Sequence, residues 1–131
     1  MTAPRTGLIK WADLTVPNIE EVVDFYQGVV GWNAAAYEMP DRTDYVMSHS
    51  ETGDTAAGIC QQAGDIEGMP AQWMVYVTVE DLDDSIEAAN RLGGKVVFGP
   101  RESEMMGRWC VVQDPAGAVM ALTELTPGED N

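Results

Sequence analysis

The stretch that decides the fold is Trp73-Met74-Val75-Tyr76-Val77-Thr78-Val79-Glu80-Asp81-Leu82-Asp83-Asp84, because it repeats a pattern that occurs earlier in the chain. Its second half, Val79-Glu80-Asp81-Leu82-Asp83-Asp84, falls on Val16-Pro17-Asn18-Ile19-Glu20-Glu21. The same constant shift, here called the repeat offset, relates Gly31 to Gly94. An internal repeat of this length indicates two copies of one supersecondary unit, with a ligand site expected between the copies.

Each copy has the pattern of a β-α-β-β-β module. Alternation predicts a strand at 8–16, and Asn18 with Glu21 has the spacing of a capping box for the helix that follows. In the second copy, Asp81 is expected to cap the helix and Gly93-Gly94 to end it. Further short strands are predicted at residues 35–38, 44–49, 55–61, 95–98, 108–113 and 118–124.

The predicted fold class is α+β. A chain of 131 residues fits a single domain, with a first βαβββ module at 8–62, a linker at 63–71 and a second module at 72–125. The two pseudo-symmetric modules are expected to form a U-shaped, partly closed mixed sheet, or cup, with the helices on the outside.

Strand alternation predicts which side chains face the cup. The valines of the strand at 73–79 should pack under the second helix, so Met74 and Tyr76 are expected to face the cup. By the same rule Trp11 and Asp13 point away from the first helix.

The charge of the chain limits its partners. With 22 acidic and 7 basic residues the net charge is −15, so nucleic acid and anionic membrane surfaces would be repelled, and cationic or aromatic ligands are favoured. The first ten residues lack the apolar segment of a signal peptide. Because Cys60 and Cys110 lie in apolar strands without a metal-ligand spacing, we expect free thiols in a reducing cytoplasm.

Several short motifs together resemble those of the vicinal oxygen chelate superfamily, which includes glyoxalases, bleomycin resistance proteins and extradiol dioxygenases. The motifs are Trp11-x-Asp13-Leu14-Thr15-Val16, Phe25-Tyr26, Gly31-Trp32, Gly93-Gly94, Gly107-Arg108 and Asp114-Pro115-x-Gly117. The resemblance covers about residues 8–125. It implies paired βαβββ modules, a homodimer, and a divalent metal held by His and Glu on the inner strands.

The chain departs from that family at the metal positions. The family's His positions correspond to Trp11 and Met74, and its Glu position to Ala121, with Gly58 as the equivalent of Ala121 in the first repeat. None of these side chains binds a hard or borderline divalent ion. We therefore expect no metal site and no cofactor, and the single histidine, His49, is expected to be structural.

The candidate ligand-binding residues are an aromatic and thioether-rich set with two charged groups. They are Trp11, Asp13, Met74, Tyr76, Met106, Arg108 and Trp109. Trp73 is a further stacking candidate, and Met105–Gly107 would form a lip that closes over the ligand.

Asp13 is the one catalytic candidate. On an inner strand, a desolvated carboxylate suits a general base or a polar anchor for a ligand. Alternatively, it pairs with Arg108 or with a backbone amide.

The favoured function is binding of a small, largely apolar or aromatic molecule without a metal, as in bleomycin-resistance-type proteins. One alternative is an enzyme of the same superfamily, of the lyase, isomerase or dioxygenase kind, that uses Asp13 or an unidentified metal site. Another is an assembly module without a ligand.

Overall fold

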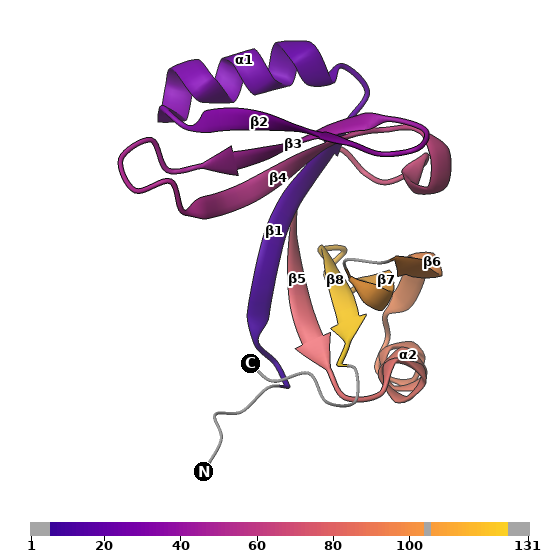
Figure 1. The fold of residues 1–131 in the computed structure, drawn as a ribbon. Helices are drawn as coiled ribbons and strands as arrows, with labels where there is room; N and C mark the ends of the chain where they lie inside the picture. The colour runs from indigo at the N-terminus through magenta and orange to yellow at the C-terminus, as the bar shows by residue number, and fades with distance from the viewer. Residues whose placement is uncertain (1–5, 104–105, 126–131) are drawn as a thin grey trace. The chain divides into compact units, whose positions relative to one another are not determined.

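The chain divides into two compact units that each hold one copy of the repeat (Figure 1). The computed structural model describes residues 6–103 and 106–125. The first-repeat unit is Ala12–Trp73, and the second-repeat unit combines the described parts of Met1–Trp11 and Met74–Asn131. Strand β1, Ile9–Val16, is therefore shared between them. The predicted single domain and the predicted cup remain predictions.

The residues directly before β1 are hydrogen-bonded to Thr78, near the end of the strand that opens the second repeat, and together with the start of β1 they lie in the second-repeat unit. The Gly7 amide donates to the Thr78 carbonyl at 2.7 Å, and the Thr78 amide donates to the Leu8 carbonyl at 3.0 Å. The Leu8 amide also donates to Thr78 Oγ1 at 3.0 Å. The unit boundary thus falls inside one strand, beyond the predicted module start at residue 8.

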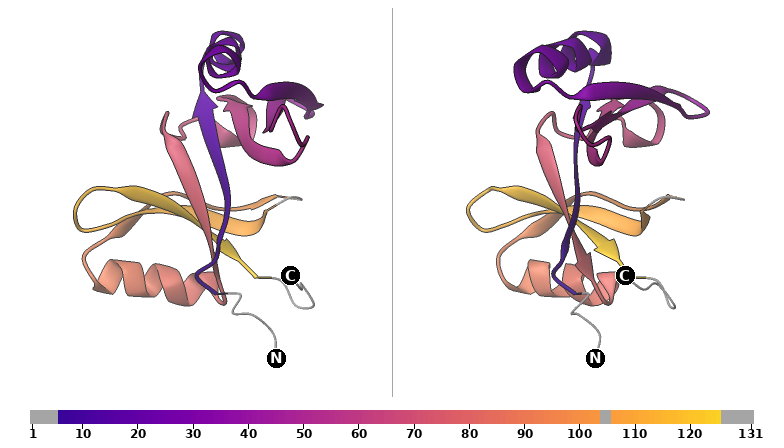
Figure 2. Two further views of the ribbon diagram at one scale, coloured as in Figure 1. Left: turned by 90° about the vertical axis from the view of Figure 1, so that its left-hand side faces the viewer. Right: turned by 60° about the vertical axis from the view of Figure 1, so that its left-hand side comes forward.

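The first-repeat unit is a helix on a four-stranded mixed sheet (Figure 2). Its strands are hydrogen-bonded in the order β2-β3-β4-β1, with β1 parallel to β4 and the other pairs antiparallel. After β1 its elements are α1 (Ile19–Val30), β2 (Asn33–Glu38), β3 (Thr43–Ser48), β4 (Thr55–Gln61) and a 3₁₀ turn (Gly64–Ile66).

The second-repeat unit has the same order of elements. They are β5 (Trp73–Val79), α2 (Leu82–Arg91), β6 (Lys95–Ser103), β7 (Gly107–Gln113) and β8 (Val119–Glu124). Its strands follow the order β5-β8-β7-β6, and β5 is parallel to β8. The α+β class and the repeated βαβββ module are confirmed.

The repeat extends to the pairing of individual residues. In the first repeat Asp13 lies opposite Gly58, and in the second their equivalents under the repeat offset, Tyr76 and Ala121, lie opposite each other. The remaining three pairs of β1 with β4 map onto β5 with β8 in the same way. The repeat offset therefore relates every parallel pair of the first-repeat unit to a parallel pair of the second-repeat unit.

The antiparallel hairpins do not keep the one constant shift that was expected from the sequence. Tyr45 lies opposite Ile59, whereas Cys110 lies opposite Leu122. The repeat offset relates Ile59 to Leu122, but it relates Tyr45 to Arg108 rather than to Cys110. A β-bulge at the end of β3 accompanies this difference. His49, which was expected to be structural, lies in the exposed β3–β4 turn.

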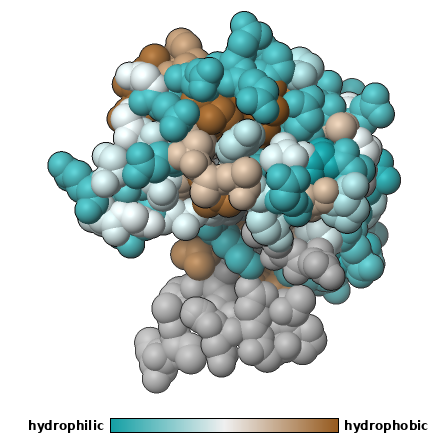
Figure 3. Space-filling view, turned by 45° about the horizontal axis from the view of Figure 1, so that its top comes forward, coloured by the Kyte–Doolittle hydropathy of each residue, from teal (hydrophilic) through white to brown (hydrophobic). Residues whose placement is uncertain are grey.

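The two helices bury one face each against their own sheets. Ile19 and Val23 of α1 pack with Leu14, Val16, Met47 and Ile59, and the α2 residue Leu82 packs with Cys110 and Leu122. With 12 and 10 residues, neither α1 nor α2 has the length and apolarity to cross a membrane, and this holds for every helix of the described residues. Figure 3 shows a largely hydrophilic face with separate hydrophobic patches, as the acidic composition leads one to expect.

The predicted helix caps have different outcomes. Asp81 caps α2, because its Oδ1 accepts the amide of Asp84 at 3.0 Å. Asn18 lies at the N-cap position of α1 as predicted, but the predicted capping box is wrong: the Asn18 side chain accepts no amide and instead donates from Nδ2 to Glu21 Oε1 at 2.9 Å. The first amide of α1 is bonded by a residue from β4, Gln61, whose Oε1 accepts from Ile19 at 3.3 Å.

Candidate functional site

The sheet of the second-repeat unit has one face against α2 and one face away from it. Val77 and Val79 of β5 pack with Leu82 under α2, as predicted. Met74 and Tyr76 alternate with them, so they lie on the opposite face, where they are 1% and 3% exposed. This opposite face, away from α2, carries the candidate site.

Three aromatic rings lie in a row on this face. Tyr76 and Trp109 have ring centroids 6.0 Å apart, with their planes tilted by 51°. Trp109 is stacked on Phe98, with a centroid distance of 5.6 Å and an interplanar angle of 28°. Both separations fall in the range where aromatic pairs attract each other. We call Tyr76, Trp109 and Phe98 the aromatic row.

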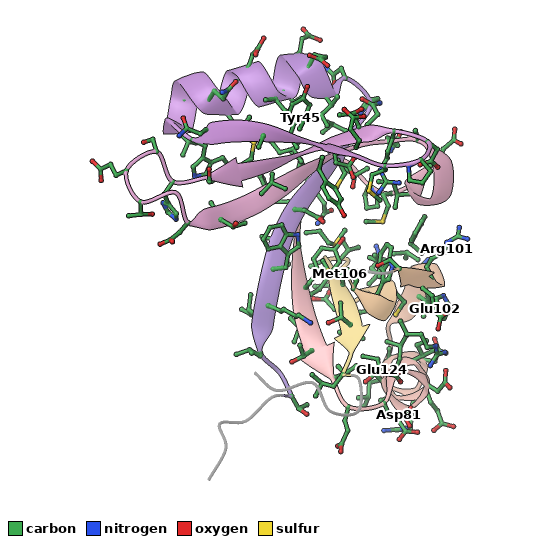
Figure 4. The ribbon with its side chains drawn as sticks, viewed as in Figure 1. Tyr45, Asp81, Arg101, Glu102, Met106 and Glu124 are labelled. Atoms are coloured by element: carbon green, nitrogen blue, oxygen red, sulfur yellow. The ribbon has the colours of Figure 1, made fainter. Side chains whose placement is uncertain are left out.

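A guanidinium group lies at the end of the aromatic row. The Cζ of Arg101 is 5.0 Å from the centroid of the Phe98 ring, within the range of a cation–π contact. Arg101 is exposed, whereas Tyr76 and Trp109 are buried and Phe98 is partly buried. The Phe98–Arg101 pair is therefore the part of the row that solvent reaches. Figure 4 shows Arg101 and Glu102 on opposite sides of β6, with Arg101 on the side away from α2.

A bulge in β6 brings Phe98 and Arg101 to the same face. Residues three apart in a regular strand point to opposite faces. Here Phe98 lies opposite Val111 and Arg101 lies opposite Trp109, so three steps along β6 match two steps along β7. Gly99 occupies the bulge with φ +86°, in the region that favours glycine.

A buried hydroxyl lies beside the aromatic row. Thr123 of β8 is directly opposite Trp109 and is 1% exposed. Its Oγ1 has no hydrogen-bond partner among the described residues. A buried hydroxyl without a partner is a cost to the fold, and a polar ligand atom is one way in which that cost is relieved.

Arg108 is placed away from the aromatic row. Its Nη2 donates to Asp83 Oδ1 of α2 at 2.9 Å, and its Nη1 lies 3.5 Å from Glu124 Oε2. The hydrogen bond with Asp83, with the negative charge of that carboxylate and of Glu124, raises the pKa of Arg108. The Arg108 guanidinium therefore lies on the α2 face of the sheet, opposite the face that carries Trp109 and Tyr76.

The predicted lip is only partly described. Met105 lies outside the described residues. Met106 is partly buried, and its amide donates to Ser103 Oγ at 2.9 Å. Ser103 ends β6 and lies opposite Gly107, the first residue of β7, so Met106 belongs to the turn that joins the two strands.

Asp13 lies in the first-repeat unit, on β1 and opposite Gly58 of β4. It is 7% exposed. Burial, and after it the negative charges of Asp13 and Asp44, raises the pKa of the Cys60 thiol, so the two carboxylates lie close to that sulfur. Asp44 is held by Arg42, whose Nε lies 3.0 Å from both carboxylate oxygens, and by the Gln61 amide, also at 3.0 Å.

The tryptophans do not all lie where stacking on a ligand was expected. Trp73 packs in the first-repeat unit: its Nε1 donates to the Tyr26 hydroxyl at 3.0 Å, and its ring lies 6.0 Å from that of Trp32. It therefore supports the core under α1. Trp11 is partly buried at the β1 boundary between the units.

No three His, Cys, Asp or Glu side chains within residues 6–103 and 106–125 are grouped so that they could hold a metal ion. Ala121 lies opposite Tyr76 and Val111, and its methyl group offers no donor atom.

Arg101 was missed in the sequence because the predicted strand ended at residue 98, and Phe98, the last residue of that strand, was assigned to neither face. The signal that could have found them is Gly99-Pro100. A glycine in a strand that continues beyond it marks a bulge, and bulges turn side chains to new faces next to binding sites.

Comparison with known proteins identifies relatives over almost the whole chain. Residues 8–122 match the family model of the Glyoxalase/Bleomycin resistance protein/Dioxygenase superfamily. The anthracycline biosynthesis protein DnrV of Streptomyces peucetius is 31% identical over 134 residues, which cover 93% of this chain and 48% of that protein. The chain thus spans about half the length of this curated relative.

Solved structures share the fold at low sequence identity. A hypothetical protein, BH1468, from Bacillus halodurans has a TM-score of 0.60 at 12% identity, with 95% of this chain and 99% of that chain covered. Methylmalonyl-CoA epimerase from Mycobacterium tuberculosis has a TM-score of 0.56 at 16% identity, with 97% and 94% covered. At these identities the likeness concerns the fold alone.

Proposed function

The chain belongs to the glyoxalase/bleomycin resistance protein/dioxygenase superfamily, and we propose that it binds a small, largely aromatic or apolar molecule without a metal. The binding surface is the face of the second-repeat unit that points away from α2. The observation that carries the proposal is the aromatic row Tyr76–Trp109–Phe98, with Arg101 at its accessible end.

The arrangement of the row supports a ligand surface. In a hydrophobic core, side chains need only to fill the available space. The core cluster under α2 is filled by aliphatic side chains, one thioether and one thiol. On the opposite face, aromatic residues are combined with an exposed cation and a buried hydroxyl without a partner among the described residues. Apolar surface with a few convergent polar groups is typical of small-molecule sites.

Binding without a metal is supported by the residues at the family's metal positions. Trp11, Met74, Gly58 and Ala121 provide no oxygen or imidazole ligand. The relative DnrV is an anthracycline biosynthesis protein, and anthracyclines are fused-ring aromatic compounds. An aromatic ligand for this chain agrees with that relationship.

The test is a binding titration with naphthalene derivatives, followed through tryptophan fluorescence. We expect saturable binding to the wild-type chain, and in Phe98→Ala an affinity several-fold weaker, because an aromatic contact contributes ~0.5–1.5 kcal/mol. Phe25→Ala is the matched control, since Phe25 is a 57% exposed residue of α1 in the other unit. Absence of saturable binding to the wild type, or equal effects of the two variants, would contradict the proposal.

A second candidate function is catalysis in the first-repeat unit with Asp13 as the base. The observation that favours it is a carboxylate only 7% exposed, whose negative charge, like that of Asp44, raises the pKa of the buried Cys60 thiol. Asp13→Asn would then abolish turnover of a bound ligand while its affinity is retained. Unchanged turnover in that variant would remove Asp13 from any catalytic role.

A further inference from the structure

We propose that the ligand of the aromatic row carries an anionic oxygen, as in an aromatic carboxylate or an ionised phenol, and that Arg101 is the residue that selects it. This inference rests on the proposed function and adds the chemical class of the ligand. It starts from the state of Arg101, which makes a cation–π contact with Phe98 and no ion pair with any described residue.

The state of Arg101 differs from that of two other arginines in the structure. Arg42 is paired with Asp44 and Arg108 with Asp83 and Glu124. The exposed Arg91 and Lys95 likewise make no ion pair with a described residue, so what distinguishes Arg101 is its place on the Phe98 ring. The N–H donors of Arg101 therefore remain available to a ligand, and a planar guanidinium matches a carboxylate in a two-point contact.

The backbone of β6 is shaped for this placement. The bulge at Gly99 turns Arg101 to the face of Phe98 and Trp109. A Cβ at Gly99 would lie 3.1 Å from the Trp109 carbonyl oxygen and 3.2 Å from the Cys110 Cα. Since both atoms belong to the backbone, the close approach of β6 to β7 at this point requires glycine. The cation is thus held at the end of the row by the fold of the strand.

The position of Arg101 reverses the ligand preference that the net charge alone predicts. A net charge of −15 attracts cations over long distances, but salt screens that field beyond ~8–10 Å. At contact distance a ligand on Phe98 meets the Arg101 guanidinium, which lies 5.0 Å from the ring centroid. An aromatic cation on this ring would meet like charge, whereas an aromatic anion would gain a charge-assisted hydrogen bond.

The experiment compares three ligands that share one ring system and differ in charge. Naphthoate is the anion, naphthalenemethanol is neutral and naphthylmethylamine is the cation. We expect the wild-type chain to bind naphthoate most tightly and the amine least tightly. In Arg101→Gln, naphthoate binding should weaken by about tenfold or more, and that of naphthalenemethanol should change by less than about twofold. Arg101→Lys should recover only part of the loss, because it keeps the charge without the planar fork.

The matched control is Arg91→Gln, which removes the same charge from an exposed position in the last turn of α2. It should leave the order of the three ligands and the naphthoate affinity unchanged. Equal unfolding midpoints for the three variants would show that they are folded alike. If the wild type binds the amine or the neutral ligand most tightly, or if Arg101→Gln weakens all three ligands alike, the inference fails while the proposed function stands. If the wild type binds none of them, both fail.

Discussion

Gln61 and Glu124 occupy equivalent positions in the two repeats and perform the same task, each bonding the first amide of the helix in its own unit. Gln61 Oε1 accepts from Ile19 at 3.3 Å, and Glu124 Oε2 accepts from Leu82 at 2.7 Å. Each residue ends the last strand of its repeat and bonds a helix that starts 42 residues earlier. The repeat thus retains a tertiary contact between its last strand and its helix.

Loss of either contact should destabilise the chain. We expect Gln61→Ala and Glu124→Ala each to lower the free energy of unfolding by about 1 kcal/mol, as for other helix-capping side chains. Glu124→Gln should lose less, because an amide oxygen still accepts from Leu82, as Gln61 does from Ile19. Urea unfolding measures the differences. Gln27→Ala, in an exposed position of α1, is the control and should stay within ~0.5 kcal/mol. Equal stabilities for all four variants would contradict the assignment.

Gly99→Ala should be strongly destabilising. The new methyl group would meet the backbone of Trp109 and Cys110, and the positive φ of +86° adds strain. We expect a loss of about 2 kcal/mol or more in thermal or urea unfolding. Gly53→Ala is the control, because Gly53 has φ +79° with nothing within 4 Å of the added Cβ, so only the strain of about 1 kcal/mol remains. Similar losses in the two variants would show that β6 is free to move at Gly99.

The two thiols should react slowly in the folded chain. Burial raises the pKa of Cys110 from 9.0 to about 11, and burial with the charges of Asp13 and Asp44 raises that of Cys60. A raised thiol pKa keeps the protonated form favoured below it, so at pH 8 the thiolate fraction of Cys110 falls by roughly a hundredfold. Alkylation by iodoacetamide, located by mass spectrometry, should therefore be slow at pH 8 and should become fast when urea is added. Equal rates with and without urea would contradict the burial of the thiols.

Neutralising Asp13 should make the Cys60 thiol more acidic, because the charge of Asp13 contributes to its raised pKa. In Asp13→Asn, alkylation of Cys60 at a fixed pH should be faster than in the wild type. Asp54→Asn, in the exposed β3–β4 turn, is the control for the loss of one charge. If both variants react alike, Asp13 does not lie against Cys60.

Salt should stabilise the chain at neutral pH. A net charge of −15 causes self-repulsion in the folded state, and raising the salt from 0.1 M to 1 M shortens the Debye length from ~10 Å to ~3 Å. Relief of about 1 kcal/mol would raise the melting temperature by ~4 °C in a chain of this size. Near the isoelectric point of about 4.1 the same change in salt should have little effect. An equal rise at both pH values would point to a salt effect unrelated to net charge.

The purified chain, expressed without a chelating tag, should contain well below one metal ion per molecule, since Trp11, Met74 and Ala121 replace the family's ligands. Elemental analysis by mass spectrometry measures the content, and EDTA should leave the melting temperature unchanged. A stoichiometric transition metal would overturn this prediction and would make Asp13 and His49 the first residues to substitute.

The sequence by itself determined the elements that depend on local pattern and on the repeat. Period-two alternation placed Val77 under α2 and Tyr76 on the other face, and the repeat predicted the same order of strands and helix in both halves of the chain. These features can be predicted from the sequence because alternation is visible within each strand and a repeat is visible when two stretches of one chain are compared.

The tertiary structure alone decided which charged and aromatic side chains come together. A bulge shifts every later residue of β6 to the other face. Arg101, which was not predicted as a site residue, therefore lies on the ring of Phe98 at the end of the aromatic row. Alternation alone puts Arg108 and its neighbour Trp109 on opposite faces of β7, but the tertiary structure supplied the partners of Arg108, which are Asp83 of α2 and Glu124 of β8. Contacts of this kind depend on strand register and on partners far apart in the chain, and a local pattern does not encode either of them.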